Sequence, residues 1–293
     1  MGRRFDTISF LSDLGAADES VGLIHAIVRD LAPHAVVVDL THHVPAYDVR
    51  AGSLALARAI GYVPSGVVLA SVDAGPEFDR PFVAIEVVGG EGVLIGPDNG
   101  LLAPAVAMAG GAERAVYLTN DEYHLGSPGG PFATRDVLAP VAAHLCNGVD
   151  LTALGDEVDA DVLLPGVVPL PRDADDGGGV HADVLWVNHV GNVQLNVGVD
   201  DLGDWGGPEG ARLLVVAGDV TRVAQRVAHA GRLGSGSIGL VLDPFGMLAL
   251  VLDRRSAADE LQLAAGDQLM LTPLAEGDRG PGSTSPVTMR PHR

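Results

Sequence analysis

The chain has 293 residues, of which 18 are basic and 38 acidic, so its formal net charge is −20. A field of this sign repels polyanions, and nucleic acid is therefore excluded as an expected partner. All the basic residues are arginines, and the absence of lysine excludes Schiff-base chemistry, pyridoxal phosphate and the lysine-dependent phosphate loop.

Hydrophobic residues make up 47% of the chain, but Asp, Pro or Gly interrupts every apolar run before it could span a bilayer. The apolar stretch that follows Arg3 and Arg4 contains acids and lacks a small-residue cleavage site, so no signal peptide is expected. Cys146 is the single cysteine, and its apolar surroundings predict a buried packing residue. We expect a cytoplasmic protein without a membrane partner.

In chain order, short β-branched runs alternate with helical stretches, which favours an α/β domain with a mostly parallel sheet over residues 1–165. A length near 165 residues suits one such domain. The expected elements are strands at 7–11, 35–40, 66–72, 82–88, 92–95 and near Val116, and helices at 20–31, 49–60, after Asn99 and at 135–146.

Residues 166–179 are rich in proline, acids and glycine and are predicted to be a linker. Beyond it, short apolar runs separated by Gly and Asp turns favour a smaller all-β, barrel-like domain over residues 180–276. Residues 277–293 hold much Gly, Pro, Ser and Thr and are expected to be disordered. The expected strands of the second domain are 182–188, 192–197, 212–216, 238–242 and 247–252.

Three expected strands of the first domain run into acidic segments, at Asp13, Asp39 and Asp73. Loops at the carboxyl ends of parallel strands are where open α/β sheets bind ligands, and a carboxylate there can bind a ribose diol or hold a proton. The alternative is that each Asp caps a helix or closes a turn. We assign that role to Asp39 and treat the other two as ligand-binding candidates.

Two basic groups are candidate sites. His42 and His43 are adjacent, and neighbouring residues on a strand point to opposite faces, so a metal site is not expected. The spacing of Arg222, Arg226, His229 and Arg232 is helical and is interpreted as a solvated arginine face, with an anion site as the alternative.

Together the acidic segments and several turn sequences resemble the S-adenosylmethionine hydrolases, also called hydroxide adenosyltransferases, a family related to the fluorinases and chlorinases. The resemblance covers almost the whole chain before the expected tail. Its landmarks, in order, are Leu-Ser-Asp13-Leu-Gly, Asp39-Leu-Thr-His, Val-Pro-Ala-Tyr47-Asp48-Val, Val-Asp73-Ala-Gly with Arg80, Gly-Pro-Asp98-Asn99-Gly, Arg135-Asp136 and Gly191-Asn192.

The resemblance implies cleavage of S-adenosylmethionine at its 5′ carbon by water, without a cofactor, giving adenosine and L-methionine. It also implies a homotrimer with active sites between neighbouring subunits. At the reacting centre, Asp73 would accept a proton from the water, Arg80 would orient Asp73, and Thr134 would supply a third contact.

The resemblance further implies a set of substrate-binding residues. Asp13 would bind the ribose hydroxyls, Tyr47 would pack on the substrate, Asn192 would bind the adenine edge and Asn188 the methionine amine. The full implied set is Asp13, Asp18, Ser20, Tyr47, Asn99, Asn188, Asn192, Asp243, Phe245 and Arg254.

Some positions depart from the family pattern. Hydrolases of this family typically show Phe-His-Gly-Arg-Asp, whereas this chain reads Phe132-Ala133-Thr134-Arg135-Asp136, so the histidine of the family triad is absent. Asn188 stands where relatives usually carry Asp, and Asp253-Arg254-Arg255 replaces Asn-Gly-Gly. Two alternatives therefore stay open: halide-dependent adenosyl transfer, as in chlorinases and fluorinases, and binding of S-adenosylmethionine or adenosine without turnover.

Overall fold

The computed structural model describes residues 2–75, 80–175 and 178–274. The chain divides into two units, Met1–Val168 and Pro169–Arg293, and the division falls inside the stretch 166–179 that was predicted to be a linker. The predicted tail, 277–293, lies outside the described residues. No helix in the described part of the chain has the length and apolar character needed to cross a bilayer.

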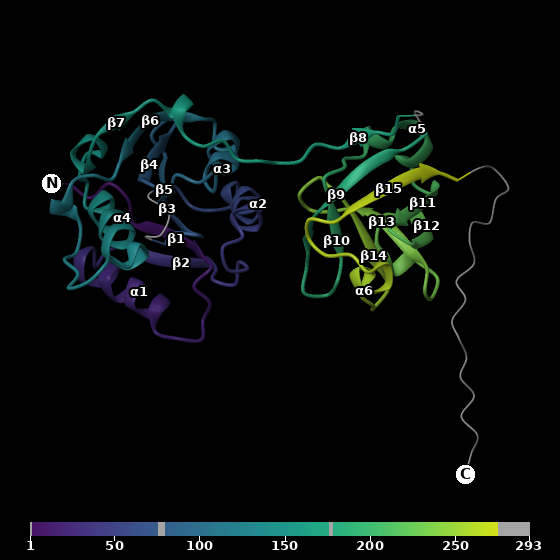
Figure 1. Cartoon of the computed structure of the whole chain (residues 1–293), viewed down its shortest axis with the longest axis horizontal. Helices are drawn as coiled ribbons and strands as arrows, with labels where there is room; N and C mark the ends of the chain where they lie inside the picture. The colour runs from purple at the N-terminus through teal and green to yellow at the C-terminus, as the bar shows by residue number, and fades with distance from the viewer. Residues whose placement is uncertain (1, 76–79, 176–177, 275–293) are drawn as a thin grey trace, which may run out of the picture. The chain divides into compact units, whose positions relative to one another are not determined.

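The first unit is built on a seven-stranded sheet with the order β2-β1-β3-β5-β4-β6-β7 (Figure 1). The predicted parallel pairing is present for β2, β1, β3 and β5, while β4, β6 and β7 are antiparallel to their neighbours. The strands are β1 Thr7–Ser12, β2 Val36–Thr41, β3 Gly66–Ser71, β4 Phe82–Val87, β5 Gly92–Pro97, β6 Ala112–Tyr117 and β7 Glu157–Val158.

A short turn explains why the sheet changes direction at β4 and β5. Only residues 88–91 connect the two strands, which is too few for a helical crossover, and Gly89 and Gly90 adopt positive φ of 88° and 67°. Glycine takes up such angles without steric cost, so these residues close a hairpin. The antiparallel half of the sheet therefore begins at this turn.

Helices cover both faces of the first sheet (Figure 1). Side chains alternate along each strand, so Val67 and Leu69 of β3 pack on one face while Val68 and Ala70 pack on the other. α1 and α4 belong to the first face, and α2 and α3 to the second. The helices are α1 Ser20–Leu31, α2 Val49–Ile60, α3 Ala103–Met108 and α4 Ala139–Cys146, the last preceded by a π-helical turn, η3, at Thr134–Leu138.

The second unit is a closed barrel of seven strands. Its sheet runs β10-β14-β13-β12-β11-β15-β9-β8, and the additional pairing of β10 with β9 closes the seven strands from β10 to β9. Closure removes the free strand edges of the barrel. The seven barrel strands are β9 Val180–Val187, β10 Val193–Leu195, β11 Arg212–Ala217, β12 Val220–Arg226, β13 Ile238–Leu242, β14 Leu248–Leu252 and β15 Gln268–Pro273, and β8 Arg172–Asp173 pairs with β9 outside the closure.

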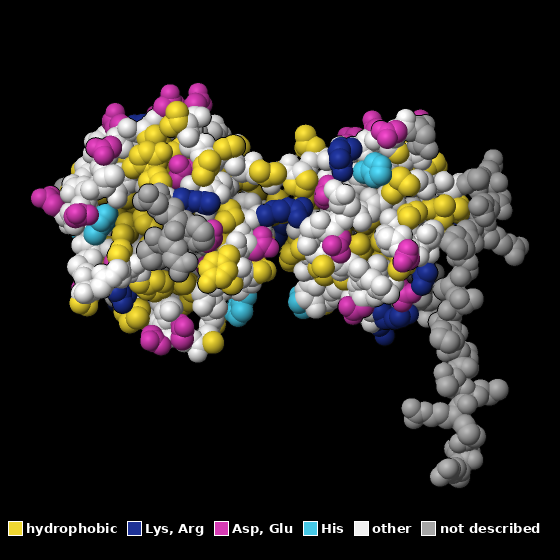
Figure 2. Space-filling model, viewed as in Figure 1, with side chains coloured by type: hydrophobic (Ala, Val, Ile, Leu, Met, Phe, Trp, Pro, Cys, Tyr) yellow, Lys and Arg dark blue, Asp and Glu magenta, His cyan; other side chains and the backbone are white. Residues whose placement is uncertain are grey.

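The barrel interior is filled by aliphatic side chains such as Leu195, Leu213 and Leu250, each fully buried. Two short helices, α5 Gly203–Gly206 and α6 Ala257–Leu261, lie between strands in the sequence, and Ala257 and Leu261 of α6 join the same core. On the visible surfaces, Asp and Glu side chains are widely spread (Figure 2). This distribution agrees with the net charge of −20.

Candidate functional site

The carboxyl ends of the parallel strands carry the predicted polar residues of the first unit. β1, β3 and β5 end at Ser12, Ser71 and Pro97, and the loops that follow contain Asp13, Asp73 and Asn99. Neighbouring parallel strands end at one edge of a sheet, so these loops come together. The edge is therefore the candidate site of this unit.

Asp13 connects two other loops of this edge. Its Oδ2 accepts hydrogen bonds from the backbone N–H of Tyr47, at 3.0 Å, and of Asp73, at 3.2 Å. Both donors have left-handed backbone conformations, with φ of 65° at Tyr47 and 53° at Asp73. Such conformations are costly for residues other than glycine and gather at functional sites. The structure thus brings together three of the residues named from sequence.

Asp73 presents an unusual carboxylate. Its Oδ1 is buried and has no hydrogen-bond partner among the described residues. A buried carboxylate oxygen without a partner is energetically costly, and it suits a place where a water molecule or a substrate group completes the site. Arg80 is exposed, and residues 76–79 between it and Gly75 lie outside the described residues. Its pairing with Asp73 stays a prediction.

Asn99 supports the strand end before Asp73. Its Nδ2 donates to the carbonyl of Val72 at 3.0 Å, and its Oδ1 accepts from the N–H of Leu101 at 3.1 Å. Both ends of the amide therefore contact the backbone. This geometry assigns Asn99 a bracing contact beside Asp73, and its predicted contact with substrate stays a prediction.

Thr134 is buried at the first position of the π-helical turn η3. Its hydroxyl lies 2.6 Å from the hydroxyl of Ser71, the last residue of β3, two positions before Asp73. The predicted third contact of Thr134 at the reacting centre stays a prediction. In the next landmark pair, the Arg135 side chain donates to Asp136 at 2.6 Å and 2.8 Å. These bonds hold the pKa of Asp136 below its ordinary value. Ala133, at the position of the family histidine, is buried.

Asp18 and Ser20 lie at the start of α1. Asp18 is exposed, and its Oδ1 accepts the backbone N–H of Ser20 at 2.9 Å. This bond is the main reason why the pKa of Asp18 lies below its ordinary value. The observed contact is a local turn, and the predicted contact of both residues with methionine stays a prediction.

The second unit contains a cavity of about 440 Å³ beside the barrel strands. It gathers four of the five residues predicted for this unit. It is also lined by three polar or aromatic residues that were not identified from sequence. The predicted residues of the lining are Asn188, Asn192, Asp243 and Phe245, and the additional ones are Trp186, Gln194 and His229.

A tight turn places Asn188 and Asn192 at this cavity. The Oδ1 of Asn188 accepts the N–H groups of Val190, at 3.1 Å, and Asn192, at 2.9 Å. Between them, Gly191 has φ of 83°, and a Cβ there would lie 2.2 Å from Ser256 Oγ. Only glycine fits both the backbone angle and the approach of the Ser256 segment. The Gly191-Asn192 landmark therefore has a steric cause.

Asp243 holds the loop that carries Phe245. One carboxylate oxygen accepts the N–H groups of Phe245, at 2.8 Å, and Met247, at 3.0 Å, while the other contacts Gln194 Nε2. Phe245 is 41% exposed and lines the cavity. Arg254 is exposed in a turn after β14 with φ of 55° and is not part of the lining. Its role in substrate binding stays a prediction.

Two interpretations from the sequence are wrong. Asp39 neither caps a helix nor closes a turn, because it lies inside β2 opposite Phe10 and its carboxylate contacts His25. The arginine cluster is not a helical face, because Arg222 and Arg226 lie on β12 and His229 lines the cavity. A polar residue that follows a run of β-branched residues can lie within an edge strand, and residues four apart need not lie on a helix.

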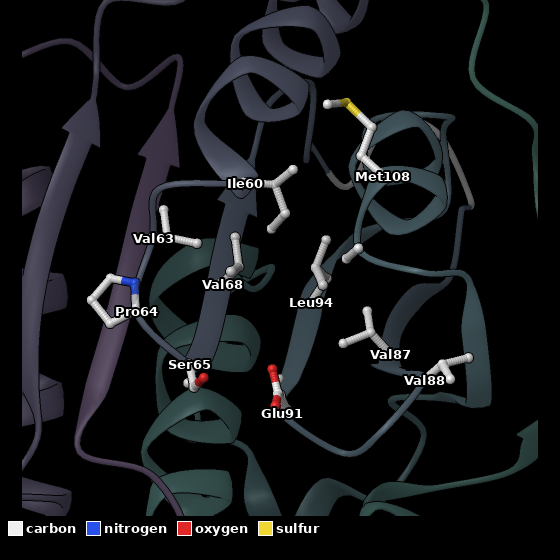
Figure 3. A pocket seen from close by; sticks show the side chains of 14 residues that line it. Ile60, Val63, Pro64, Ser65, Val68, Val87, Val88, Glu91, Leu94 and Met108 are labelled. Atoms are coloured by element: carbon white, nitrogen blue, oxygen red, sulfur yellow. The ribbon is translucent and has the colours of Figure 1, made fainter.

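Cys146 and a second cavity both lie away from the residues around Asp13 and Asp73. Burial raises the pKa of Cys146 to about 12, with a smaller contribution from Asp6, so the thiol stays protonated. A second cavity, of about 290 Å³, lies near the beginnings of β3 and β5, lined by apolar side chains such as Ile60 and Leu94 (Figure 3). That is the opposite end of the strands from Asp73. Among the described residues, no group of three or more His, Cys, Asp or Glu is arranged to hold a metal ion.

Comparisons with known proteins decide the family. The model of the SAM hydroxide adenosyltransferase N-terminal domain matches residues 8–155. A relative from Salinispora tropica, named (R)-S-adenosyl-L-methionine hydrolase, is 39% identical over 90% of this chain and 97% of its own. The chain belongs to the SAM hydroxide adenosyltransferase family. A fluorinase from Actinoplanes sp. is more distant, at 26% identity over 90% of this chain and 97% of its own.

Two solved structures have a similar fold. A conserved protein from Thermotoga maritima is similar with a TM-score of 0.81 and 28% identity, covering 90% of this chain and 99% of that one. A protein from Thermus thermophilus has a TM-score of 0.69 and 31% identity over the same shares. The family model spans β1 to η4 (Leu151–Leu154) and so includes the edge with Asp13 and Asp73.

Proposed function

We propose that this protein hydrolyses S-adenosylmethionine at the 5′ carbon, giving adenosine and L-methionine. The observation that carries the proposal is the Oδ1 of Asp73, which is buried and has no hydrogen-bond partner among the described residues. Asp13 holds Asp73 at the strand edge through its backbone N–H. The relatives' names specify the R form of S-adenosyl-L-methionine. We therefore propose this form as the preferred substrate.

The proposed reaction is a displacement at carbon. The oxygen of water attacks the 5′ carbon, the bond from that carbon to sulfur breaks, and the bonding electron pair stays on sulfur as the thioether of methionine. The water proton passes to the carboxylate of Asp73, which acts as general base. Because the sulfonium is already a good leaving group, the reaction is proposed to need no cofactor.

The charge of Asp73 supports water over halide as the nucleophile. A carboxylate a few ångströms from a halide in a poorly solvated site costs several kcal/mol. The same carboxylate can accept a proton from water. A minor halide-dependent transfer is the second candidate, and the hydroxyl at Thr134 favours it, because the resemblance implies a small hydroxyl residue of the fluorinases at this position.

In this proposal each unit contributes residues that bind the substrate. Asp13 has a second carboxylate oxygen for the ribose hydroxyls, because Oδ2 is the one bonded to the backbone. Tyr47, 74% exposed, would pack on the substrate. Trp186 and Phe245 would flank the adenine, and Asn192 would bind its edge. Aromatic side chains with a nearby amide are typical of purine pockets.

We also propose the homotrimer, with sites between neighbouring subunits, that the resemblance implies. A particle mass of three times the 30.0 kDa of the chain in sedimentation experiments would support it. A monomer that turns over substrate at full rate would contradict it. The cytoplasmic location stays a prediction.

Product analysis tests the proposed function. The parent protein is incubated with the R and S sulfonium forms separately, in halide-free buffer and in buffer containing chloride or fluoride. We expect adenosine and methionine from the R form without halide, and loss of about 10²-fold or more in rate for Asp73→Asn, since the general base is removed.

Three outcomes would contradict the proposal. The first is a strict halide requirement with a 5′-halo-nucleoside as product. The second is tight binding without any product in a single turnover at stoichiometric protein, which would indicate a binding protein. The third is equal, slow release of adenosine by the parent, Asp73→Asn and Arg80→Ala.

A further inference from the structure

His42 occupies a buried position beside the candidate edge. It follows β2 directly, is 8% exposed, and its ring packs on Phe10 of β1 with centroids 4.6 Å apart. Its neighbour His43 is exposed. A buried imidazole has to satisfy two ring nitrogens, so its partners reveal what it does.

The imidazole and backbone of His42 both contact the loop that contains Asp13. Nδ1 lies 2.8 Å from the hydroxyl of Ser12, which is fully buried. The backbone carbonyl of His42 accepts the N–H of Gly15 at 2.7 Å. Ser12 Oγ in turn accepts the N–H of Leu14 at 3.3 Å. His42 therefore contacts the loop on both sides of Asp13.

Asp39 determines which ring nitrogen of His42 carries the proton. Asp39 Oδ1 lies 3.0 Å from His42 Nε2 and 2.9 Å from Nε2 of the half-exposed His25. This close contact is not a hydrogen bond, and His42 Nε2 has no hydrogen-bond partner among the described residues. An unprotonated Nε2 would place its lone pair against the carboxylate, so the proton belongs on Nε2 and Nδ1 is the acceptor.

The charge state of Asp39 agrees with this assignment. Partial burial alone would raise its pKa, but the polar contacts with His25 and His42 bring the pKa of Asp39 below its ordinary value. With Nδ1 of His42 as acceptor, the Ser12 hydroxyl donates to it and keeps its lone pairs for the Leu14 N–H. All these bonds are mutually compatible in one protonation state.

We propose that His42 is a positioning residue for the reaction: through Ser12 it holds the Asp13 loop, and through Asp13 it sets the backbone at Asp73. The inference rests on the proposed function. Few contacts link His42 to Asp73: His42 contacts Ser12, Ser12 directly precedes Asp13, and Asp13 Oδ2 accepts the N–H of Asp73 at 3.2 Å. Small displacements of a reacting group can reduce the rate by up to about 10²-fold.

Two amide substitutions separate the contacts of His42. In His42→Asn the side-chain oxygen replaces Nδ1 as the acceptor for Ser12, and the contact with Asp39 is lost. In His42→Gln the amide reaches the position of Nε2 toward Asp39, and the contact with Ser12 is lost. His43→Asn is the matched control, because this neighbouring histidine is exposed.

Steady-state kcat and KM with S-adenosylmethionine, the Kd of adenosine and the melting temperature are measured for all four proteins. We expect His42→Asn and His43→Asn to keep kcat within about threefold of the parent, and His42→Gln to lose about tenfold or more in kcat. The proposal is overturned if His42→Gln retains the kcat of the parent. It is also overturned if His42→Asn and His42→Gln lose the same amount of kcat and if this loss follows the fall in their melting temperatures. That result would show that His42 has a merely structural role.

The outcome is separable from the proposed function. If the parent protein forms no adenosine, the proposed function fails, and the Kd of adenosine then tests the positioning of Asp13 by itself. We expect this Kd to rise at least about threefold in His42→Gln and to stay unchanged in His42→Asn. An unchanged Kd in His42→Gln would overturn the inference in that case.

Discussion

The carboxylate of Asp13 accepts the backbone N–H of Asp73 at 3.2 Å, across 60 residues of sequence. The same oxygen accepts the N–H of Tyr47 at 3.0 Å. One side chain thus orients two loops whose backbones both take up left-handed angles. Asp13 therefore has a structural task at the edge in addition to its proposed contact with the ribose.

Substitution of Asp13 separates these two tasks. Asp13→Ala removes the acceptor of both N–H groups and the ribose contact, and we expect kcat/KM to fall about 10²-fold or more. Asp13→Asn keeps one acceptor oxygen but not the charge, so we expect a smaller loss that is mainly in KM. Steady-state kinetics measure both. Equal losses in the two variants would contradict the bridging role of Asp13.

Substitutions in the barrel cavity should affect binding more than chemistry. Trp186→Ala and Asn192→Ala remove groups that line the cavity, and we expect each to raise KM by about tenfold with a smaller effect on kcat, because ground-state and transition-state binding weaken together. Val190→Ala is the control, since Val190 is exposed in the same turn and outside the lining. Unchanged KM in both variants would place the adenine elsewhere.

The hydroxyl pair of Thr134 and Ser71 gives a prediction on stability and rate. Thr134→Val conserves the shape but leaves the buried Ser71 hydroxyl without its 2.6 Å partner, and we expect a loss of about 1–3 kcal/mol in the free energy of unfolding. Because Ser71 precedes Asp73 by two residues, kcat should fall as well. Thr134→Ser keeps the hydroxyl and should retain most of both properties. Denaturant unfolding and initial rates measure them. If Thr134→Ser loses as much kcat as Thr134→Val, the contact with Ser71 is not what matters.

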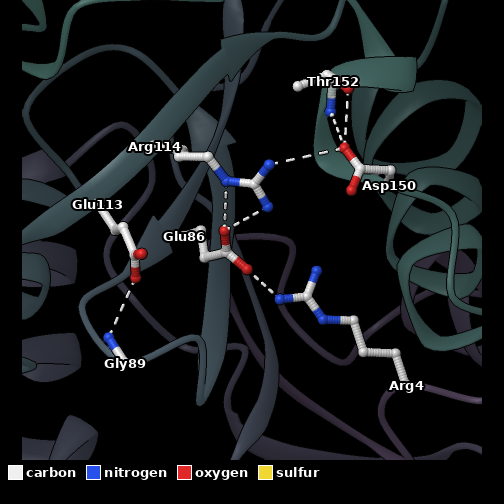
Figure 4. A network of polar contacts seen from close by, with 7 residues as sticks. All are labelled: Arg4, Glu86, Gly89, Glu113, Arg114, Asp150 and Thr152. Carbon is white, nitrogen blue, oxygen red and sulfur yellow. Dashed lines mark hydrogen bonds and ion pairs between the residues drawn. The ribbon is translucent and has the colours of Figure 1, made fainter.

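The lowered pKa of Glu86 predicts how the free energy of unfolding depends on pH. It is 3% exposed on β4 and accepts hydrogen bonds from Arg4 and Arg114, the latter at 2.7 Å (Figure 4). Burial alone would raise its pKa, but the hydrogen bonds and charges of the two arginines lower it below the ordinary 4.5. A lowered pKa in the folded state stabilises the protein above pH 4.5, and this contribution disappears as the pH falls through the folded value.

We therefore expect Glu86→Gln to lower the free energy of unfolding by about 1–3 kcal/mol at pH 7. The difference from the parent should shrink as the pH falls below 4.5. Urea unfolding at several pH values measures it, with the exposed Glu122→Gln as control. A difference that does not depend on pH would show that the charge of Glu86 is not its cause.

Periodicity and turn composition predicted much of the fold. Alternating β-branched runs located β1, β2 and β3, and the helical stretches located α1 and α2 with the bounds that the structure shows. These elements pack through one face or through alternate residues, which leaves a clear pattern in the sequence. The hairpin between β4 and β5 was also readable in principle, because Gly89-Gly90 is a turn signal.

Other features depend on contacts between distant residues and leave weaker patterns. β12 ends in Arg226, a charged residue that is buried because its side chain donates to two backbone carbonyls, at 2.9 Å and 3.1 Å. A buried arginine breaks the apolar pattern by which a strand is recognised in a sequence. Trp186 and Asn188 lie two residues apart and so share a face, a signal that could have identified Trp186 in the cavity lining. The contact of Ser71 with Thr134 spans 63 residues, and no local pattern predicts it.

The origin of the oxygen in the product tests the central claim most directly. The parent protein is incubated with (R)-S-adenosyl-L-methionine in ¹⁸O-labelled water, and the adenosine is examined by mass spectrometry. Attack of water on the 5′ carbon predicts one ¹⁸O atom at the 5′-hydroxyl and unlabelled methionine, with this labelled product strongly reduced in Asp73→Asn. Unlabelled adenosine, a 5′-halo-nucleoside, or the same labelling at the same rate in Asp73→Asn would contradict the account.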